Sequence, residues 1–234
     1  MTGSLRVAAL HAPVTVLGPG RRVGLWVQGC QRHCPGCIAP LMQPASGGTL
    51  WPVPLLARQI ALHVSELKLD GLTISGGEPL DQSAQLRELV LLLKQDHPGL
   101  DTLVYSGFSL LDGPDSAGMA FFGEPRSLHQ VTDWIDVLID GEYQSGQASN
   151  LSLRGSRNQR IHRLTSLGRQ RYGVDLEEMP RSGMLESFMD TGGIFMAGIP
   201  LHDTLPNRDK GDDHGRPYVP TLQKNLQSTH GCLS

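Results

Sequence analysis

The sequence predicts an α/β fold with a largely parallel sheet, on two observations. First, short apolar segments alternate with amphipathic helical segments over residues 5–139, which is typical of parallel strands joined by right-handed crossovers. Second, three of the expected strands end in a turn of small residues, namely Gly76-Gly77, Ser106-Gly107 and Asp140-Gly141. Ligands collect at the carboxyl ends of parallel strands, although each turn taken alone is equally well explained as an ordinary strand–helix connection.

Hydrophobic periodicity and turn residues define the individual elements. Strands are expected at 5–10, 24–28, 72–75, 102–105 and 134–139, where apolar residues run up to a glycine or a polar turn. A helix should begin at Pro54, because Leu56, Ile60, Val64 and Leu67 recur at helical spacing. Further helices are expected over 82–95 and, more weakly, 127–131, and a hairpin within 184–200.

Composition limits the class of protein. The chain has 234 residues with 39% hydrophobic content, enough for one substantial core. Its formal net charge of −3 argues against a nucleic-acid surface, which is normally basic. No apolar run approaches the roughly 20 residues needed to cross a bilayer, and residues 1–7 lack the apolar stretch of a secretory signal. A cytoplasmic location is therefore expected.

Three of the four cysteines lie within eight residues, at Cys30, Cys34 and Cys37. This C-x3-C-x2-C spacing favours metal binding over disulfides. Three thiolates can hold a 4Fe–4S cubane and leave one iron without a protein ligand, and an open metal position is what a catalytic centre needs. Ligation by four cysteines would instead suggest electron transfer or a structural role. A zinc site is the alternative, and it would need His33 or Cys232 as its fourth ligand.

A second motif, Ser75-Gly76-Gly77-Glu78-Pro79, follows an expected buried strand. Its glycine carbonyls and the Glu78 carboxylate could hold a cationic amino group beside an open iron. The alternative is that Glu78 only caps the helix that begins near Asp81, because acidic residues are favoured at helix N-termini.

These motifs, in this order, resemble those of radical S-adenosylmethionine (SAM) enzymes, and more narrowly the activating enzymes of anaerobic ribonucleotide reductase. The resemblance covers about residues 14–163, and its matching segments are 18–22, 25–30, 34–37, 75–80, 104–108, 137–143 and 154–160. The basic segment 154–160 (RGSRNQR) narrows the resemblance to the activases, although alone it would be interpreted as a solvated loop. Two features depart from the family: Ile38 replaces a common aromatic, and roughly 70 residues follow the usual C-terminus.

The resemblance implies a partial (β/α)6 barrel of the radical SAM type, binding a 4Fe–4S cluster and SAM. Cys30, Cys34 and Cys37 would be the cluster ligands, and no further side chain would be catalytic. Gly77 and Glu78 would hold the amino group of SAM. The other candidates for SAM contacts are Gly36, Ile38, Gly76, Ser106, Asp140 and Glu142.

The implied domain is residues 1–201, with the core at about 14–163 and an extension over 164–201 that includes the hairpin. Residues 202–234 are polar and rich in Pro, Gly, Asp and Asn, which predicts a flexible tail.

The expected function is reductive cleavage of SAM to a 5′-deoxyadenosyl radical that activates a glycyl radical enzyme. A flavodoxin- or ferredoxin-type protein would donate the electron, and neither nucleic acid nor a membrane is an expected partner. One alternative is a radical SAM enzyme that modifies a small molecule or peptide. Another is a non-catalytic metal-binding interaction module. The sequence names neither the hydrogen donor nor the oligomeric state.

Overall fold

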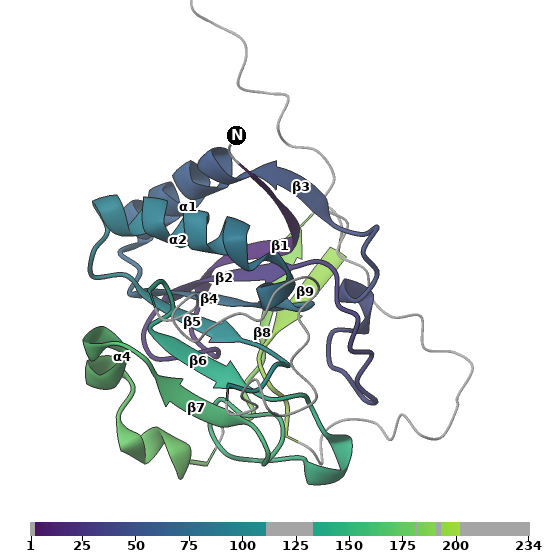
Figure 1. Ribbon diagram of the computed structural model, residues 1–234. Coiled ribbons are helices and arrows are strands. Elements are labelled where there is room, and N and C mark those ends of the chain that lie inside the picture. The colour runs from purple at the N-terminus through teal and green to yellow at the C-terminus, as the bar shows by residue number, and fades with distance from the viewer. Residues whose placement is uncertain (1–2, 111–132, 181, 191–192, 202–234) are drawn as a thin grey trace, which may run out of the picture.

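Strands β1 to β7 form one sheet, in the order β3-β1-β2-β4-β5-β6-β7 (Figure 1). The computed structural model describes residues 3–110, 133–180, 182–190 and 193–201. The weak helix expected at 127–131 and the tail expected at 202–234 lie outside these residues. The strands are β1 (Ser4–Val14), β2 (Arg22–Val27), β3 (Thr49–Pro52), β4 (Gly71–Gly76), β5 (Asp101–Tyr105), β6 (Val137–Asp140) and β7 (Arg160–Arg163).

The centre of the sheet is parallel and its margins are antiparallel. β2, β4, β5 and β6 run in the same direction. β1 and β3 on one side, and β7 on the other, run antiparallel to their neighbours. In register, Val27 is opposite Gly76, and Tyr105 is opposite Ile139. The carboxyl ends of the four parallel strands therefore meet at one edge of the sheet.

Two helices, α1 (Val53–Leu67) and α2 (Ser83–Asp96), cover one face of the sheet (Figure 1). A short 3-10 helix, η2 (Pro79–Gln82), leads into α2. The helices bury the apolar residues that predicted them, Leu56, Ile60 and Val64 on α1 and Leu86, Leu89, Val90 and Leu93 on α2. Each fully buried side chain of this size contributes about 1.5–3 kcal/mol of transfer free energy, so these two stripes fix both helices on the sheet.

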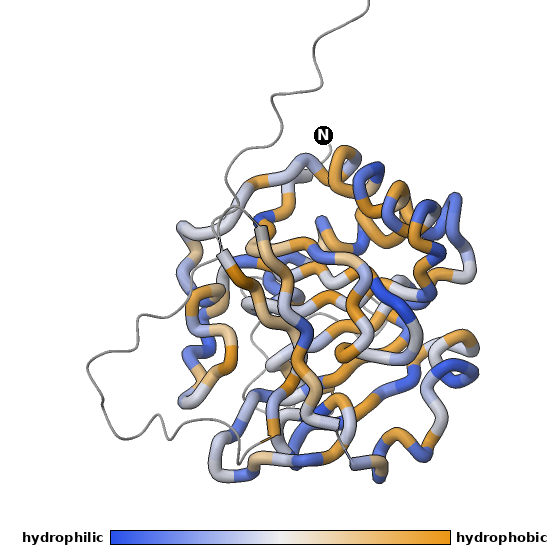
Figure 2. Tube along the Cα trace, turned by 180° about the vertical axis from the view of Figure 1, so that it is seen from behind, coloured by the Kyte–Doolittle hydropathy of each residue, from blue (hydrophilic) through white to orange (hydrophobic). Residues whose placement is uncertain are grey.

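The hairpin of β8 (Glu186–Asp190) and β9 (Gly193–Ala197) packs on the other face of the sheet. Figure 2 shows the molecule from behind, with this face toward the viewer. Phe195 lies edge-on to Trp26 of β2, with ring centroids 4.6 Å apart. Phe188 stacks on His11 of β1 at 4.5 Å. The backbone N–H and the hydroxyl of Thr15 both donate to the carboxylate of Glu186, which fixes the start of the hairpin. The predicted hairpin is confirmed.

The α/β class is confirmed, and the expected partial barrel is not. Among the described strands, β3 and β7 are the two edges of the seven-stranded sheet and do not pair with each other. The sheet formed by these strands is therefore open. The sequence did not predict β3 or β7, because both are short margin strands of four residues with little apolar alternation. β6 begins at Val137 rather than 134, although Trp134 and Ile135 before it are fully buried. Their apolar character therefore reflects burial in a turn rather than strand pairing.

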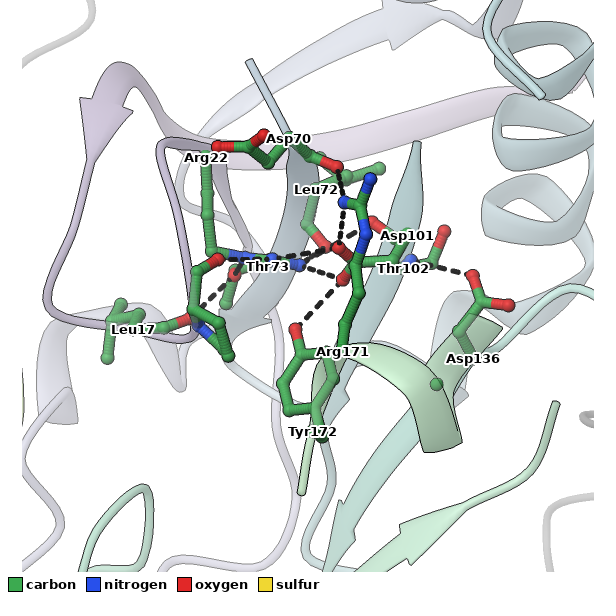
Figure 3. Close-up of polar contacts among 12 residues, drawn as sticks. Leu17, Arg22, Asp70, Leu72, Thr73, Asp101, Thr102, Asp136, Arg171 and Tyr172 are labelled. Atoms are coloured by element: carbon green, nitrogen blue, oxygen red, sulfur yellow. Dashed lines mark hydrogen bonds and ion pairs between the residues drawn. The ribbon is translucent and has the colours of Figure 1, made fainter. Parts of the chain in front are cut away.

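A buried polar network ties residues beyond 163 to the sheet (Figure 3). Asp101, at the start of β5, accepts hydrogen bonds from Arg22 of β2 and from the hydroxyl of Tyr172. Arg171, the last residue of helix α4 (Ser166–Arg171), also donates to Asp101, at 2.7 Å. The first part of the C-terminal extension is thus held by charged hydrogen bonds as well as by packing.

Removal of residues 202–234 is expected to leave the folded domain intact. All members of the three described core clusters precede Pro200, so deletion after Leu201 removes none of this buried apolar surface. The variant should remain soluble, and its free energy of unfolding should lie within about 1 kcal/mol of that of the full chain, because the described core is unchanged. Urea unfolding, together with iron content after anaerobic reconstitution, measures this. Insoluble or iron-free protein would show that the segment is structural.

Candidate functional site

The cysteine loop begins where β2 ends, at the shared carboxyl edge of the parallel strands. The N–H groups of Gly29 and Cys30 donate to the carbonyls of Met42 and Gln43, at 2.8 and 2.9 Å. The side-chain amide of Gln28 donates to the carbonyls of Leu41 and Pro44. These bonds close the loop on itself, because residues 28–30 lie directly beside residues 41–44.

All three predicted ligands lie within this loop as half-buried free thiols. The N–H of Cys37 donates to the carbonyl of Cys34 at 3.1 Å, which folds the last two cysteines into a turn. The thiol of Cys34 donates to Oε1 of Glu142 at 3.3 Å. Burial raises the pKa of Cys34 to about 12, and Glu142 adds to the shift. Without metal the thiol keeps its proton, and a metal must displace that proton on binding.

The donor set suits a multinuclear cluster better than a single ion. Across the described residues, no three His, Cys, Asp or Glu side chains lie close enough to share one metal ion. A mononuclear zinc site needs four ligands at about 2.0–2.3 Å from one ion, whereas each cysteine of a cubane binds a different iron. His33 is exposed, and its Nδ1 lies 3.2 Å from Oε1 of Gln43, while Cys232 lies outside the described residues. The three free thiols of the cysteine loop are the donors that a 4Fe–4S cluster requires.

The Gly76–Glu78 turn lies against the start of the cysteine loop. The N–H of Gly77 donates to Val27 and that of Glu78 to Gly29, both at 2.8 Å. Gly76 has a φ of +106°, a conformation that side-chain-bearing residues rarely adopt. A Cβ atom on Gly77 would lie 2.2 Å from the carbonyl oxygen of Gly29. Both glycines are required for this close approach, which brings the two sequence motifs together.

Glu78 is buried, with only 2% of its surface exposed. Its carboxylate accepts hydrogen bonds from the N–H of Leu80, the hydroxyl of Ser106 and the N–H of Gly107, at 2.8–2.9 Å. Burial raises its pKa to about 6, against the lowering effect of these bonds. The capping role is confirmed by the bond to Leu80. The carboxylate also joins the end of β4 to the end of β5, and its contact with SAM stays a prediction.

The turn after β6 is held by the basic segment 154–160. The Gln159 amide donates to the carbonyl of Gly141, and the Asn158 amide donates to that of Glu142, at 2.9 and 2.8 Å. The Gln159 oxygen in turn accepts from the N–H groups of Gly155 and Ser156. The segment is therefore not a solvated loop. It fixes the backbone of Glu142, the residue that contacts Cys34.

Asp140 has its own set of partners. Its carboxylate accepts from the N–H of Leu110 at 2.6 Å and lies 3.0 Å from Nε2 of His162. Burial alone would raise the pKa of Asp140, but the close contact with His162 and the hydrogen bond from Leu110 lower it below its usual value. Asp140 therefore stays ionised and links the ends of β6 and β7 to the segment after β5.

The other candidates lie around the same edge. Gly36 has a φ of +74°, and a Cβ atom on it would meet Tyr143 and Ser145 at 3.4–3.5 Å. Ile38 is 54% exposed, so it is free to contact a ligand. Ser106 is committed to Glu78. All eleven predicted site residues thus lie at or just beyond the carboxyl ends of β2, β4, β5 or β6.

Sequence reasoning missed Arg32, which lies between the first two cysteines. Its guanidinium stacks on the ring of Phe108, with Cζ 3.9 Å from the ring centroid. Its Nε lies 3.5 Å from Oε2 of Glu78. The sequence carries no signal for this, because a single arginine in a loop has no periodic pattern or partner spacing.

Two of the cavities in the described part of the chain bear on the position of the site. One, of about 330 Å³, adjoins the cysteine loop and is lined by Gln28, Gly29, Cys30, Gln31, His33, Gln43, Pro44, Ala45 and Asp81. The other, of about 530 Å³, lies beside β7 and is lined by Ile161, His162, Arg163, Leu164, Arg169, Tyr172 and Val174. None of the predicted site residues lines the larger cavity, so its size does not make it the site.

The sequence is similar to those of known proteins. A family profile described as a 4Fe–4S single cluster domain matches residues 16–162. The anaerobic ribonucleoside-triphosphate reductase-activating protein of Vibrio cholerae is 33% identical over 160 residues, which are 66% of this chain and 96% of that protein. The proteins of the same name from Escherichia coli K12 and phage T4 are 33% and 31% identical, over 66% and 62% of this chain and 96% and 86% of their own lengths.

Among solved structures, QueE from Escherichia coli matches with a TM-score of 0.31 and 14% identity, over 44% of this chain and 52% of that chain. This likeness is too low to carry an argument.

The sheet edge, the three-cysteine loop and the glycine turn together define an iron–sulfur α/β protein. The chain belongs to the 4Fe–4S single cluster domain family, together with the anaerobic ribonucleoside-triphosphate reductase-activating proteins. About a third of the chain has no counterpart in these relatives. No described helix has both the length and the apolar character needed to span a membrane.

Proposed function

We propose that this protein is a radical SAM activase that generates a glycyl radical in a partner enzyme of the anaerobic ribonucleotide reductase type. The observation that carries this is the approach of the Gly76–Glu78 turn to the cysteine loop, through the bonds of Gly77 and Glu78 to Val27 and Gly29. Three thiols and a carbonyl-rich turn then lie on one sheet edge. The names of the relatives supply the partner class.

In this proposal the thiolates of Cys30, Cys34 and Cys37 would hold the cluster and leave one position without a protein ligand, open to SAM. When bound and reduced, the cluster would supply the one electron that cleaves SAM to methionine and a 5′-deoxyadenosyl radical, which would take a hydrogen atom from a glycine of the partner and end as 5′-deoxyadenosine. Cluster and SAM carry this chemistry, and the protein orients them and excludes water.

The chain's own groups would orient the cluster and SAM and would not transfer protons. Gly77 and Glu78 would hold the amino group of SAM, with Gly36, Ile38, Gly76, Ser106, Asp140 and Glu142 around the rest. Hydrogen-atom abstraction depends on holding the reacting atoms close, so no general base is assigned. The sheet would correspond to the partial (β/α)6 barrel of radical SAM enzymes. The electron donor would be a flavodoxin- or ferredoxin-type protein, and the protein would act in the reducing cytoplasm.

The test is anaerobic reconstitution with iron and sulfide, reduction, and incubation with SAM, with and without a candidate glycyl radical enzyme. We expect 5′-deoxyadenosine in both reactions, and a glycyl radical EPR doublet only with the partner. Formation of 5′-deoxyadenosine without any radical on the partner would favour the alternative of a small-molecule or peptide substrate. Protein that binds iron and sulfide but never cleaves SAM would contradict the enzymatic proposal.

A further inference from the structure

Arg32 is a charged side chain of the cysteine loop that contacts the neighbouring strand ends. It lies between Cys30 and Cys34, and 23% of its side chain is exposed. Its guanidinium lies over the ring of Phe108, which follows β5, with Cζ 3.9 Å from the ring centroid. This distance is well inside the limit of about 6 Å for a cation–π interaction.

The second contact of Arg32 is with a fixed carboxylate. Nε of Arg32 lies 3.5 Å from Oε2 of Glu78, an ion pair too long for a hydrogen bond. Three donors already hold Glu78, from Leu80 on one side and from Ser106 and Gly107 on the other. Since the carboxylate cannot follow Arg32, it serves as a stationary anchor for the cysteine loop.

The backbone next to this anchor leaves room for the arginine stem. A Cβ atom on Gly107 would lie 2.5 Å from Cδ of Arg32. A glycine at this position therefore lets the stem cross the end of β5. The stem, the stacked head group and the ion pair all lie on the same side of the loop, toward the ends of β4 and β5.

We propose that Arg32 is a positioning residue that fixes the cysteine loop relative to the Gly76–Glu78 turn, and so sets the distance between the open iron and the group that holds SAM. This inference rests on the proposed function. It assigns Arg32 no contact with the reacting atoms. Arginine suits the role better than lysine, because its planar guanidinium can stack on Phe108 and face Glu78 together.

The test compares Arg32→Ala, Arg32→Lys and Phe108→Leu with the unmodified full chain. Arg87→Ala is the matched control, because Arg87 lies on α2 and forms an exposed ion pair with Asp133, away from the cysteine loop. Three quantities are measured after reconstitution: iron and sulfide per chain, the SAM dissociation constant from the EPR change of the reduced cluster, and KM and kcat for 5′-deoxyadenosine formation without a partner.

We expect Arg32→Ala to keep near-full iron and sulfide, but to bind SAM about tenfold more weakly and raise KM with little change in kcat. Phe108→Leu should weaken SAM binding less, Arg32→Lys should restore part of the loss, and Arg87→Ala should match the unmodified chain. SAM binding of Arg32→Ala at the unmodified affinity would overturn the proposal. Loss of the cluster in that variant would also overturn it, since Arg32 would then be needed to build the loop. Failure of the unmodified protein to bind SAM would instead refute the proposed function.

Discussion

The Cys34→Ala variant is expected to lose the iron–sulfur cluster, and with it all SAM cleavage. Cys34 lies in the middle of the loop. Its carbonyl accepts a hydrogen bond from the N–H of Cys37, and its thiol donates one to Glu142. Two remaining thiolates cannot hold a cubane firmly. Iron and sulfide should fall to background after anaerobic reconstitution, and 5′-deoxyadenosine should become undetectable.

The control for this loss is Cys232→Ala, which removes the one cysteine outside the loop. It should retain the full iron and sulfide content if Cys30, Cys34 and Cys37 are the ligands. Zinc-loaded protein that depends on Cys232 would favour the mononuclear alternative. Near-full iron and sulfide in Cys34→Ala would contradict the three-thiolate cluster on which the proposed chemistry depends.

The α/β framework was predictable because its determinants are local. The helical stripes of Leu56, Ile60 and Val64 on α1, and of Leu86 and Leu93 on α2, are all buried where periodicity placed them. Buried parallel strands appear as continuous apolar runs, so β4 and β5 were also found from sequence. The antiparallel margins were not, because a margin strand such as β7 has one apolar residue in four, and its partner is set by tertiary contacts.

The position of the site was predictable from sequence, but the contacts between its side chains were not. The cysteine spacing and the Gly76–Glu78 motif identify the same edge that the sheet topology brings together. Two of the three hydrogen bonds to the Glu78 carboxylate, however, come from Ser106 and Gly107, which are 28 and 29 residues away. The contact of Arg32 with Phe108 and the support of Glu142 by Asn158 are likewise long-range. Spacing in sequence carries no information about such contacts.

The Asp101→Ala variant is expected to lower the free energy of unfolding by about 3–5 kcal/mol, the usual cost of removing one partner from a buried ion pair. Asp101 is 1% exposed and Arg22 is fully buried. Its carboxylate lies 2.6 Å from Nη2 of Arg22, and it also accepts from Arg171 and from Tyr172 (Figure 3). Without it, the Arg22 guanidinium keeps only neutral acceptors, so a buried positive charge is left uncompensated.

The same substitution should loosen the C-terminal extension. Tyr172 is fully buried, and burial raises its pKa well above the usual value, so its hydroxyl keeps the proton that it donates to Asp101. Tyr172→Phe removes only that hydrogen bond and should cost about 1–2 kcal/mol. Tyr172 lies beyond residues 16–162, so its hydrogen bond reports on the attachment of the C-terminal extension. If Tyr172→Phe lowers the free energy of unfolding less than Asp101→Ala does, the difference measures the loss of charge compensation at Arg22.

Urea unfolding of the metal-free protein measures both effects, and Asp133→Ala is the matched control. Asp133 pairs with Arg87 at the surface, where the two side chains are 39% and 49% exposed. Solvent screens such a pair, so its loss should cost less than about 1 kcal/mol. A comparable loss in Asp101→Ala and Asp133→Ala would mean that water reaches Arg22 once Asp101 is gone. The network would then hold the extension through hydrogen-bond geometry rather than through buried charge.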